Sequence, residues 1–140
     1  MNSQPIIAQP GQASLLEVVL PEQANHYGTL YGANALQMMG KAAFVCATRQ
    51  ARCPVVMARA DEIEFFRPIP LGSIIEIRAH IAHQGRSSME VNVEIVPEQP
   101  AGQDATPAIV GRFRMVAVDK EGRPVSIPVS DQHAKEEIRP

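Results

Sequence analysis

Three arginines and one polar turn could together bind a phosphorylated ligand. Arg59, Arg67 and Arg86 each carry a guanidinium group, whose planar set of N–H donors matches the oxygens of a phosphate. Arg86 stands in the turn Gly85-Arg86-Ser87-Ser88, which adds two hydroxyl groups and backbone amides to its positive charge. An ordinary hairpin turn accounts equally well for these four residues, because glycine is common in hairpins. The pattern leaves both interpretations open.

A second segment, 21–32 (PEQANHYGTLYG), could bring the backbone close to a negatively charged group. Gly28 and Gly32 have no side chains, so a ligand can approach the main chain closely. The segment leads into a predicted helix, whose first amides lack partners and favour negative charge. His26 could serve as a base near neutral pH, although a histidine in a loop is more often a surface residue.

Asp61 and Glu62 could supply a general base. They are adjacent in a strand-like run, so one of them must point outward from the sheet. Aspartate and glutamate are seldom buried, and a solvated carboxylate is therefore the alternative interpretation for either residue.

The histidines and cysteines do not form a metal-binding pattern. His80 and His83 have no accompanying ligands at a suitable spacing, and Cys46 and Cys53 make neither a disulfide framework nor a zinc site. We therefore expect no metal, and free thiols in a reducing cytoplasm. Cys46 is predicted to be a buried, small hydrophobic residue.

Composition and charge narrow the function classes further. The 140 residues suffice for one domain, and 45% hydrophobic with 20% charged residues is typical of a soluble globular protein. The formal net charge is −2, so nucleic acid is not expected as a partner. No apolar run is long enough for a transmembrane helix, and the N-terminus lacks the features of a secretory signal. We expect a cytoplasmic protein without membrane insertion.

Hydrophobic periodicity predicts one long helix and five strands. The helix, roughly 33–52, is apolar on most faces and so must be buried. Strands are expected at 14–20, 55–66, 74–83, 87–96 and 108–119, with a tight turn at Gly85-Arg86 and a flexible loop at 97–107. Such a helix needs the concave face of a curved sheet to cover it. We predict an α+β domain over 14–128, with a flexible arm at 1–13 and a charged tail at 129–140.

Three stretches resemble the hotdog-fold thioesterases, in particular the small bacterial acyl-CoA hydrolases. The first is LPEQANHYGTLYGANALQMMGKAA (20–43), the second is IEFFRPIPLGSIIEIRAHIAHQGRSSMEVNVEI (63–95), and the third is FRMVAVDKEGRPVSIP (113–128). They occur in the family's order and at its spacing, and the resemblance covers roughly 15–130. It implies a hotdog fold, in which a five-stranded antiparallel sheet is wrapped around one long central helix.

The resemblance also implies an activity and a site. The substrate would be an acyl-CoA thioester, hydrolysed to the free acid and CoA without a cofactor. By resemblance, the amides around Gly32 and Ala33 would bind the oxyanion that develops at the thioester carbonyl, and Asn25 would position the water or the carbonyl. The arginines and the turn 85–88 would bind the CoA phosphates. Asn25 could instead be a turn residue that caps local backbone.

The helix departs from the family pattern at Gly40. The matching position in the family carries a carboxylate that activates the water, and the loss of such a base typically costs about 10²–10⁴-fold in rate. The nearest substitutes in the sequence are Asp61 and Glu62, one of which could face the site across a dimer interface. A glycine in a helix interior costs about 1 kcal/mol against alanine, so either close packing or ligand space must require Gly40.

Two other functions are alternatives to hydrolysis. A non-catalytic acyl-CoA or lipid-binding protein could have kept the pocket after losing the base at Gly40. A hotdog dehydratase would need an acid on the helix, and the helix has none. Because hotdog domains pair edge to edge and an unpaired edge strand seeks a partner, we expect a homodimer or a higher assembly such as a tetramer or hexamer.

Overall fold

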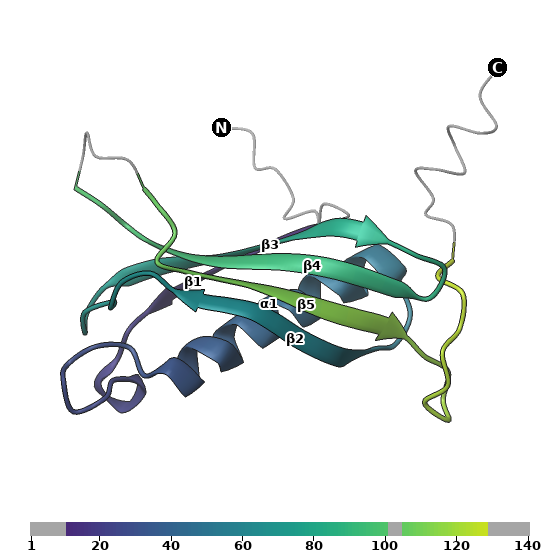
Figure 1. Cartoon of the computed structure of the whole chain (residues 1–140), viewed down its shortest axis with the longest axis horizontal. Coiled ribbons are helices and arrows are strands. Elements are labelled where there is room, and N and C mark those ends of the chain that lie inside the picture. Colours follow the sequence, from purple (N-terminus) through teal and green to yellow (C-terminus); the bar gives the residue numbers. More distant parts are fainter. Residues whose placement is uncertain (1–10, 101–104, 129–140) are drawn as a thin grey trace, which may run out of the picture.

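The computed structural model describes residues 11–100 and 105–128. In this part of the chain one long helix lies along one face of a five-stranded antiparallel sheet (Figure 1). The two layers enclose a single apolar core. The predicted α+β hotdog architecture is confirmed.

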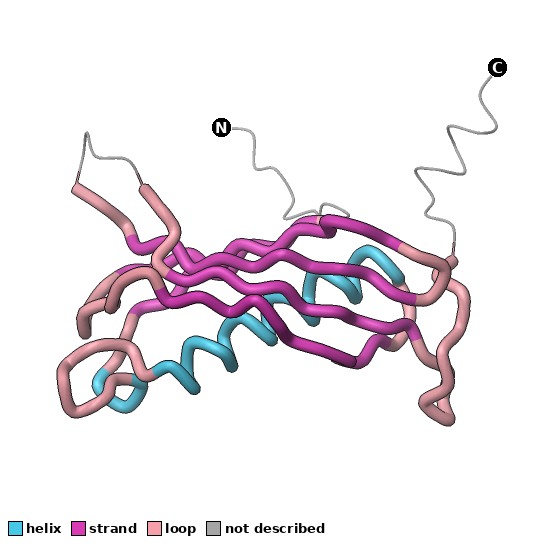
Figure 2. The backbone as a smooth tube through the Cα atoms, viewed as in Figure 1, coloured by secondary structure: helices cyan, strands magenta, loops and turns pink. Residues whose placement is uncertain are grey.

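The elements match their predicted positions to within a few residues (Figure 2). The sheet consists of β1 (Gln12–Val18), β2 (Val55–Phe65), β3 (Ile74–Gln84), β4 (Ser88–Pro97) and β5 (Ile109–Ala117). A short 3-10 helix, η1 (Pro21–Gln23), follows β1, and the long helix is α1 (Gly32–Ala51). Gln12 and Ala13 belong to β1, which corrects the prediction that the arm extends to residue 13. Residues 1–10 of the arm and the tail at 129–140 lie outside the described residues.

The order of the strands across the sheet is β1-β3-β4-β5-β2. β3, β4 and β5 form a meander, whereas β2 lies beside β5 and not beside β3, the strand that follows it in the chain. α1 therefore connects the two edge strands and crosses the whole sheet between them (Figure 1). β1 and β2 each have one edge that pairs with no other described strand.

The core lies between α1 and the central strands. α1 buries mainly small or flexible side chains, which let the helix approach the sheet closely: Ala35, Met38, Met39, Ala42, Ala43, Cys46, Ala47 and Ala51. The sheet contributes alternate residues, as the period of two predicts, among them Ile75, Ile77, Ala79, Met89, Val91, Val93 and Ile95. Among the described residues, no helix has both the length and the apolar character needed to cross a membrane.

Candidate active site

The loop between η1 and α1 is organised by the side chain of Asn25. The backbone N–H of Asn25 donates to the carbonyl of Thr29 (2.8 Å), and the N–H of Gly28 donates to the carbonyl of Asn25 (3.0 Å). Gly28 has a φ of 80°, a left-handed conformation that favours glycine. Inside the loop, Asn25 Oδ1 accepts hydrogen bonds from the N–H of Tyr27 (2.9 Å) and from the N–H and the hydroxyl of Thr29 (both 3.2 Å). Asn25 does cap local backbone.

These three bonds decide which end of the Asn25 side chain can meet a ligand. Backbone N–H groups can only donate, so the carboxamide oxygen must face them and the NH2 group must point the other way. An amide NH2 donates hydrogen bonds and takes up no proton. Asn25 can therefore hold a carbonyl or water oxygen, but it cannot act as the general base.

α1 begins at Gly32 without a side-chain cap. The N-cap residue Tyr31 makes no capping hydrogen bond, and the first turn contains no acidic residue. The N–H of Ala35 donates to the carbonyl of Tyr31 (3.0 Å), whereas the amides of Gly32 and Ala33 precede the first such intrahelical bond. They stand at the positive end of the helix dipole, where negative charge is favoured. This end of the helix is accessible, because Gly32 is half-buried and Ala33 is exposed.

Gly40 lies two turns further along α1, against β2. A Cβ atom at this position would lie 3.2 Å from Met57 Cε, so the absence of a side chain lets Met57 pack onto the helix. Gly32 has a similar neighbour, since a Cβ atom there would lie 3.6 Å from the ring of Phe65. Close packing against β2 is therefore the structural reason for a poor helix former at position 40. α1 itself contains no aspartate or glutamate.

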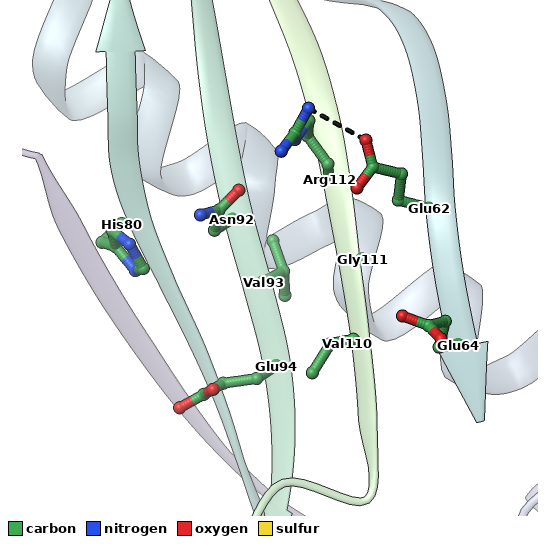
Figure 3. A pocket seen from close by; sticks show the side chains of 9 residues that line it. All are labelled: Glu62, Glu64, His80, Asn92, Val93, Glu94, Val110, Gly111 and Arg112. Atoms are coloured by element: carbon green, nitrogen blue, oxygen red, sulfur yellow. Dashed lines mark ion pairs between the residues drawn. The ribbon is translucent and has the colours of Figure 1, made fainter. Parts of the chain in front are cut away.

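Asp61 and Glu62 lie on the outer face of the sheet, which points away from α1. Asp61 is in register with Arg112 of β5. Arg112 precedes the buried Phe113, so its side chain and that of Asp61 are on the exposed face. Asp61 also forms an ion pair with Arg59 (3.1 Å). Glu62 lies at an irregularity of β2 with a φ of 53°, and its carboxylate is 2.9 Å from Arg112 Nη1 (Figure 3). The irregularity explains why two adjacent carboxylates share one face. Neither faces Gly40 of its own chain, so the expectation that one of them faces the site of a second copy across a dimer interface stays a prediction.

We expect the Asp61→Asn variant to retain its function for this reason. An exposed ion pair contributes at most about 1 kcal/mol to stability, so the variant should keep its fold. Its turnover should stay close to that of the wild type, because the carboxylate does not face the site of its own chain. Glu62→Gln should behave in the same way. The measurement is steady-state turnover of the thioester substrate that the sequence resemblance implies. A loss of turnover in either variant would show that its carboxylate serves a site on another copy of the chain.

The three arginines have different surroundings. Arg67 donates to the carbonyl oxygens of Thr106 (2.7 Å) and Pro107 (3.0 Å), and so holds the base of the β4–β5 connection. Arg59 is engaged with Asp61 on the outer face. The guanidinium of Arg86 is exposed, and it has no hydrogen-bond or ion-pair partner within the part of the chain that the structure describes. Of the three, Arg86 is the most available to a phosphate.

The turn that carries Arg86 lies at the opposite end of α1 from Asn25 (Figure 1). Gln50, near the end of α1, donates to the side chain of Gln84 (2.8 Å), immediately before the turn. β3 ends at Gln84 and β4 begins at Ser88, and the N–H of Gly85 donates to the carbonyl of Ser88 (2.8 Å), so residues 85–87 connect the two strands in a tight turn. α1 has 20 residues, which corresponds to a length of about 30 Å. One chain therefore does not bring Arg86 and Asn25 into one compact site.

An apolar hollow of about 320 Å³ beside the Asn25 loop was not predicted. Its walls come from the loop, the end of β2 and the start of β5: Thr29, Leu30, Phe65, Phe66, Arg67, Pro68, Ile69 and Ile109. The aromatic pair Phe65-Phe66 at the end of β2 is the one feature of the sequence that could have indicated this hollow.

The thiol of Cys46 is buried, as predicted. Burial raises its pKa to about 11, so Cys46 is not a nucleophile.

The sequence and the fold of this chain are similar to those of known proteins. Residues 27–102 match the family model described as Thioesterase superfamily, which covers more than half of the chain. The chain belongs to the thioesterase superfamily. Its hotdog fold is that of a thioesterase-superfamily member.

Individual relatives agree with this assignment. An uncharacterized acyl-CoA thioester hydrolase of Zymomonas mobilis is 32% identical over 91% of this chain and 85% of its own length. The acyl-CoA hydrolase of Staphylococcus aureus, solved in complex with butyryl coenzyme A, coenzyme A and coenzyme A disulfide, superposes with a TM-score of 0.79 at 28% identity, covering 89% of this chain and 78% of that one. A hexameric acyl-CoA thioesterase superposes with a TM-score of 0.78 at 28% identity, covering 91% of this chain and 86% of that one.

Proposed function

We propose that this superfamily member hydrolyses acyl-CoA thioesters to the free acid and CoA at the start of α1. The observation that carries the proposal is the carboxamide of Asn25, whose oxygen is held by the N–H groups of its own loop, on the loop that leads into the uncapped amides of Gly32 and Ala33. The relatives named as acyl-CoA hydrolases support the choice of substrate. Water is the only co-reactant, so no cofactor is needed. The two free cysteines favour a reducing compartment, the cytoplasm.

The chemistry follows from these donors. Water adds to the thioester carbonyl carbon, and the carbonyl oxygen becomes negatively charged. The amides of Gly32 and Ala33 stabilise this oxyanion, each donor contributing about 3–4 kcal/mol, while the NH2 group of Asn25 holds the carbonyl or the water oxygen. The C–S bond then breaks, the acyl group leaves as the acid and the CoA sulfur takes up a proton. Since α1 has no carboxylate, the proton of the attacking water passes to solvent.

The acyl chain is proposed to lie in apolar surroundings next to these donors. The hollow beside the Asn25 loop is lined mainly by apolar side chains, including Phe65 and Ile69. Met57 fills the space beside Gly40, where the family pattern has a carboxylate. The reacting carbonyl therefore has a polar loop on one side and an apolar wall on the other.

The CoA phosphates require a second copy of the chain. β2 is an edge strand, and Leu36, Phe44, Met57 and Phe65 form an exposed apolar surface on and beside it. Two β2 strands that pair antiparallel about a twofold axis would place the start of one beside the end of the other. The start of β2 lies next to the turn 85–88, because Val55 pairs with Ala117 and the N–H of Ala117 donates to Ser87. Arg86 and Ser88 of a second copy would thus approach Asn25.

A larger assembly is also proposed. A hexameric relative superposes on 91% of this chain. Dimers that pair through β2 would combine in threes to give such a hexamer. Closed symmetry of this kind is the rule for soluble homo-oligomers.

Thiol release from an acyl-CoA separates the hydrolase from its alternative, a non-catalytic acyl-CoA-binding protein. The absence of a carboxylate on α1 is what favours the alternative. A hydrolase releases CoA thiol continuously, and a thiol reagent records it by absorbance. A binding protein saturates with acyl-CoA in calorimetry and leaves the thioester intact.

Arg86→Ala should weaken CoA binding by about 1–3 kcal/mol, which is the range for charge-assisted hydrogen bonds. The control is Arg78→Ala, which removes an arginine already paired with Glu76 and Glu94 on the outer face and should not change CoA affinity. Isothermal calorimetry with CoA measures both variants. Equal affinities of Arg86→Ala and the wild type would move the phosphate site to another part of the surface.

A further inference from the structure

A second exposed apolar surface lies at the opposite edge of the sheet from β2. Its members are large hydrophobic side chains with 41–71% of their surface exposed: Leu16, Val18, Leu20, Leu71 and Ile74. We call this surface the β1 patch. Val18 is in register with Ile74, and the N–H of Gly72 donates to Val19, so the two chain segments continue side by side to Leu20 and Leu71. Leu16, Val18 and Ile74 therefore lie together on the outer face, and Leu20 and Leu71 follow where the two segments continue.

We propose that the β1 patch binds a second copy of this chain and joins β2-paired dimers into the hexamer. This inference rests on the proposed assembly and adds the surface that it needs. A twofold contact through β2 uses one patch of each chain and closes after two chains. A hexamer therefore requires a second, different contact on every chain. The β1 patch lies at the other edge of the sheet, where it stays accessible when β2 is paired.

The edge of β1 that pairs with no described strand also favours a second copy of the chain as the partner. β1 pairs only with β3, and no strand in the described part of the chain occupies its other edge. Single-chain proteins usually protect such an edge with charged side chains, proline or a bulge. Between Gln12 and Val18, β1 has no proline, its register with β3 is regular, and its one charged residue is the half-buried Glu17. This edge lacks the usual protection against pairing with another chain.

The polar residues next to the patch are already paired within the chain. Glu76 accepts hydrogen bonds from the hydroxyl of Ser14 (2.5 Å) and from Arg78 (2.9 Å), and Arg78 also contacts Glu94. The hydrogen bond from Ser14, followed by that from Arg78, lowers the pKa of the Glu76 carboxyl below its usual value. Protein interfaces commonly have an apolar centre that is surrounded by polar residues, as the β1 patch has beside Glu76 and Arg78.

The remainder of the outer face is less suited to this contact. It carries ion pairs across β2, β4 and β5, which involve Arg59, Asp61, Glu62, Glu90, Arg112 and Arg114 (Figure 3 shows the pair of Glu62 and Arg112). Burial of such pairs has a large desolvation cost, whereas burial of the β1 patch removes apolar surface from water. The β1 patch is thus the favoured surface.

The test compares the mass of the wild-type chain with that of Leu16→Glu by sedimentation velocity at micromolar concentration. Leu16 is 71% exposed, so its replacement should leave the fold of one chain intact. We expect the wild type to have the mass of six chains and Leu16→Glu that of two. Ile74→Ser, which adds no charge, should shift the same equilibrium toward two chains. Gln12→Glu is the matched control, because it adds a carboxylate to the outer face of the same strand outside the patch and should keep six chains.

Six chains in both Leu16→Glu and Ile74→Ser would overturn the proposal, and so would a wild type that sediments as two chains. Thiol release by Leu16→Glu separates this inference from the proposed function. A two-chain variant that still hydrolyses acyl-CoA supports both. A wild-type hexamer that does not hydrolyse acyl-CoA refutes the proposed activity and leaves the interface assignment standing.

Discussion

The Asn25→Asp variant is expected to fold like the wild type and to lose most of its turnover. An aspartate oxygen can accept the same three hydrogen bonds from Tyr27 and Thr29, so the loop should keep its conformation. The outward NH2 group becomes an oxygen, which cannot donate to a carbonyl or water. Loss of one donor to a developing oxyanion costs about 10²–10³-fold in kcat, and the added negative charge opposes the same oxyanion.

Asn25→Ala is the companion variant. It removes the acceptor as well as the donor and leaves two backbone N–H groups of the loop without their partner. We expect a loss of about 1–3 kcal/mol in the free energy of unfolding in addition to the loss of turnover. Chemical denaturation and thiol release measure the two effects separately. Wild-type turnover in Asn25→Asp would show that the side chain only shapes the loop.

The Gly40→Asp variant is expected to hydrolyse acyl-CoA faster than the wild type. It supplies a general base to a site that keeps its other groups, and the gain should be about tenfold or more, the low end of such contributions. The new Cβ atom would lie 3.2 Å from Met57 Cε, the flexible end of a side chain, which must move aside. Met57→Ala in the same chain makes room and should increase the gain. Aspartate is also a slightly better helix former than glycine.

Gly40→Asn is the matched control, since it has nearly the same size and no basic group. Steady-state thiol release compares the single and double variants. If Gly40→Asp with Met57→Ala gains nothing over Gly40→Asn, the reacting carbonyl does not lie near position 40. In that case a loss of turnover in Asp61→Asn would identify the base instead.

The secondary structure could be predicted because it depends on local patterns. Alternation of apolar and charged residues in 74–96 identified both strands and their buried faces, and a helix with apolar residues on most sides had to be covered. The position of β2 could not be predicted in this way. Its pairing with β5 rather than β3 depends on α1, which carries the chain across the sheet.

The site could be predicted in its residue types but only partly in its geometry. Asn25 and the start of α1 lie together because they are close in the sequence. Asp61 and Glu62 share the outer face because of an irregularity near Glu62, which period-two reasoning cannot foresee. The distance between Arg86 and Asn25 depends on the length of α1 and on which end of it each segment approaches.

The contact between Gly40 and Met57 is a tertiary feature of the same kind. The two residues are 17 positions apart, and no local pattern links them. The sequence indicated that position 40 needs a glycine but not which side chain requires it. Met57 Cε supplies the reason.

We infer that the start of α1 hydrolyses an acyl-CoA without a carboxylate or an imidazole on the helix itself. The pH dependence of kcat for the wild type tests it most directly, with thiol release from one saturating acyl-CoA as the signal. Without a base that titrates in this range, we predict that log kcat rises by about one for each pH unit between about pH 6 and pH 9, because the attacking water loses its proton to solvent. Gly40→Asp should instead show a plateau above the pKa of the new carboxyl. A wild-type plateau across this range would contradict the account, because it would reveal a base that is already in place, and an acyl-CoA that stays intact at every pH would contradict hydrolysis itself.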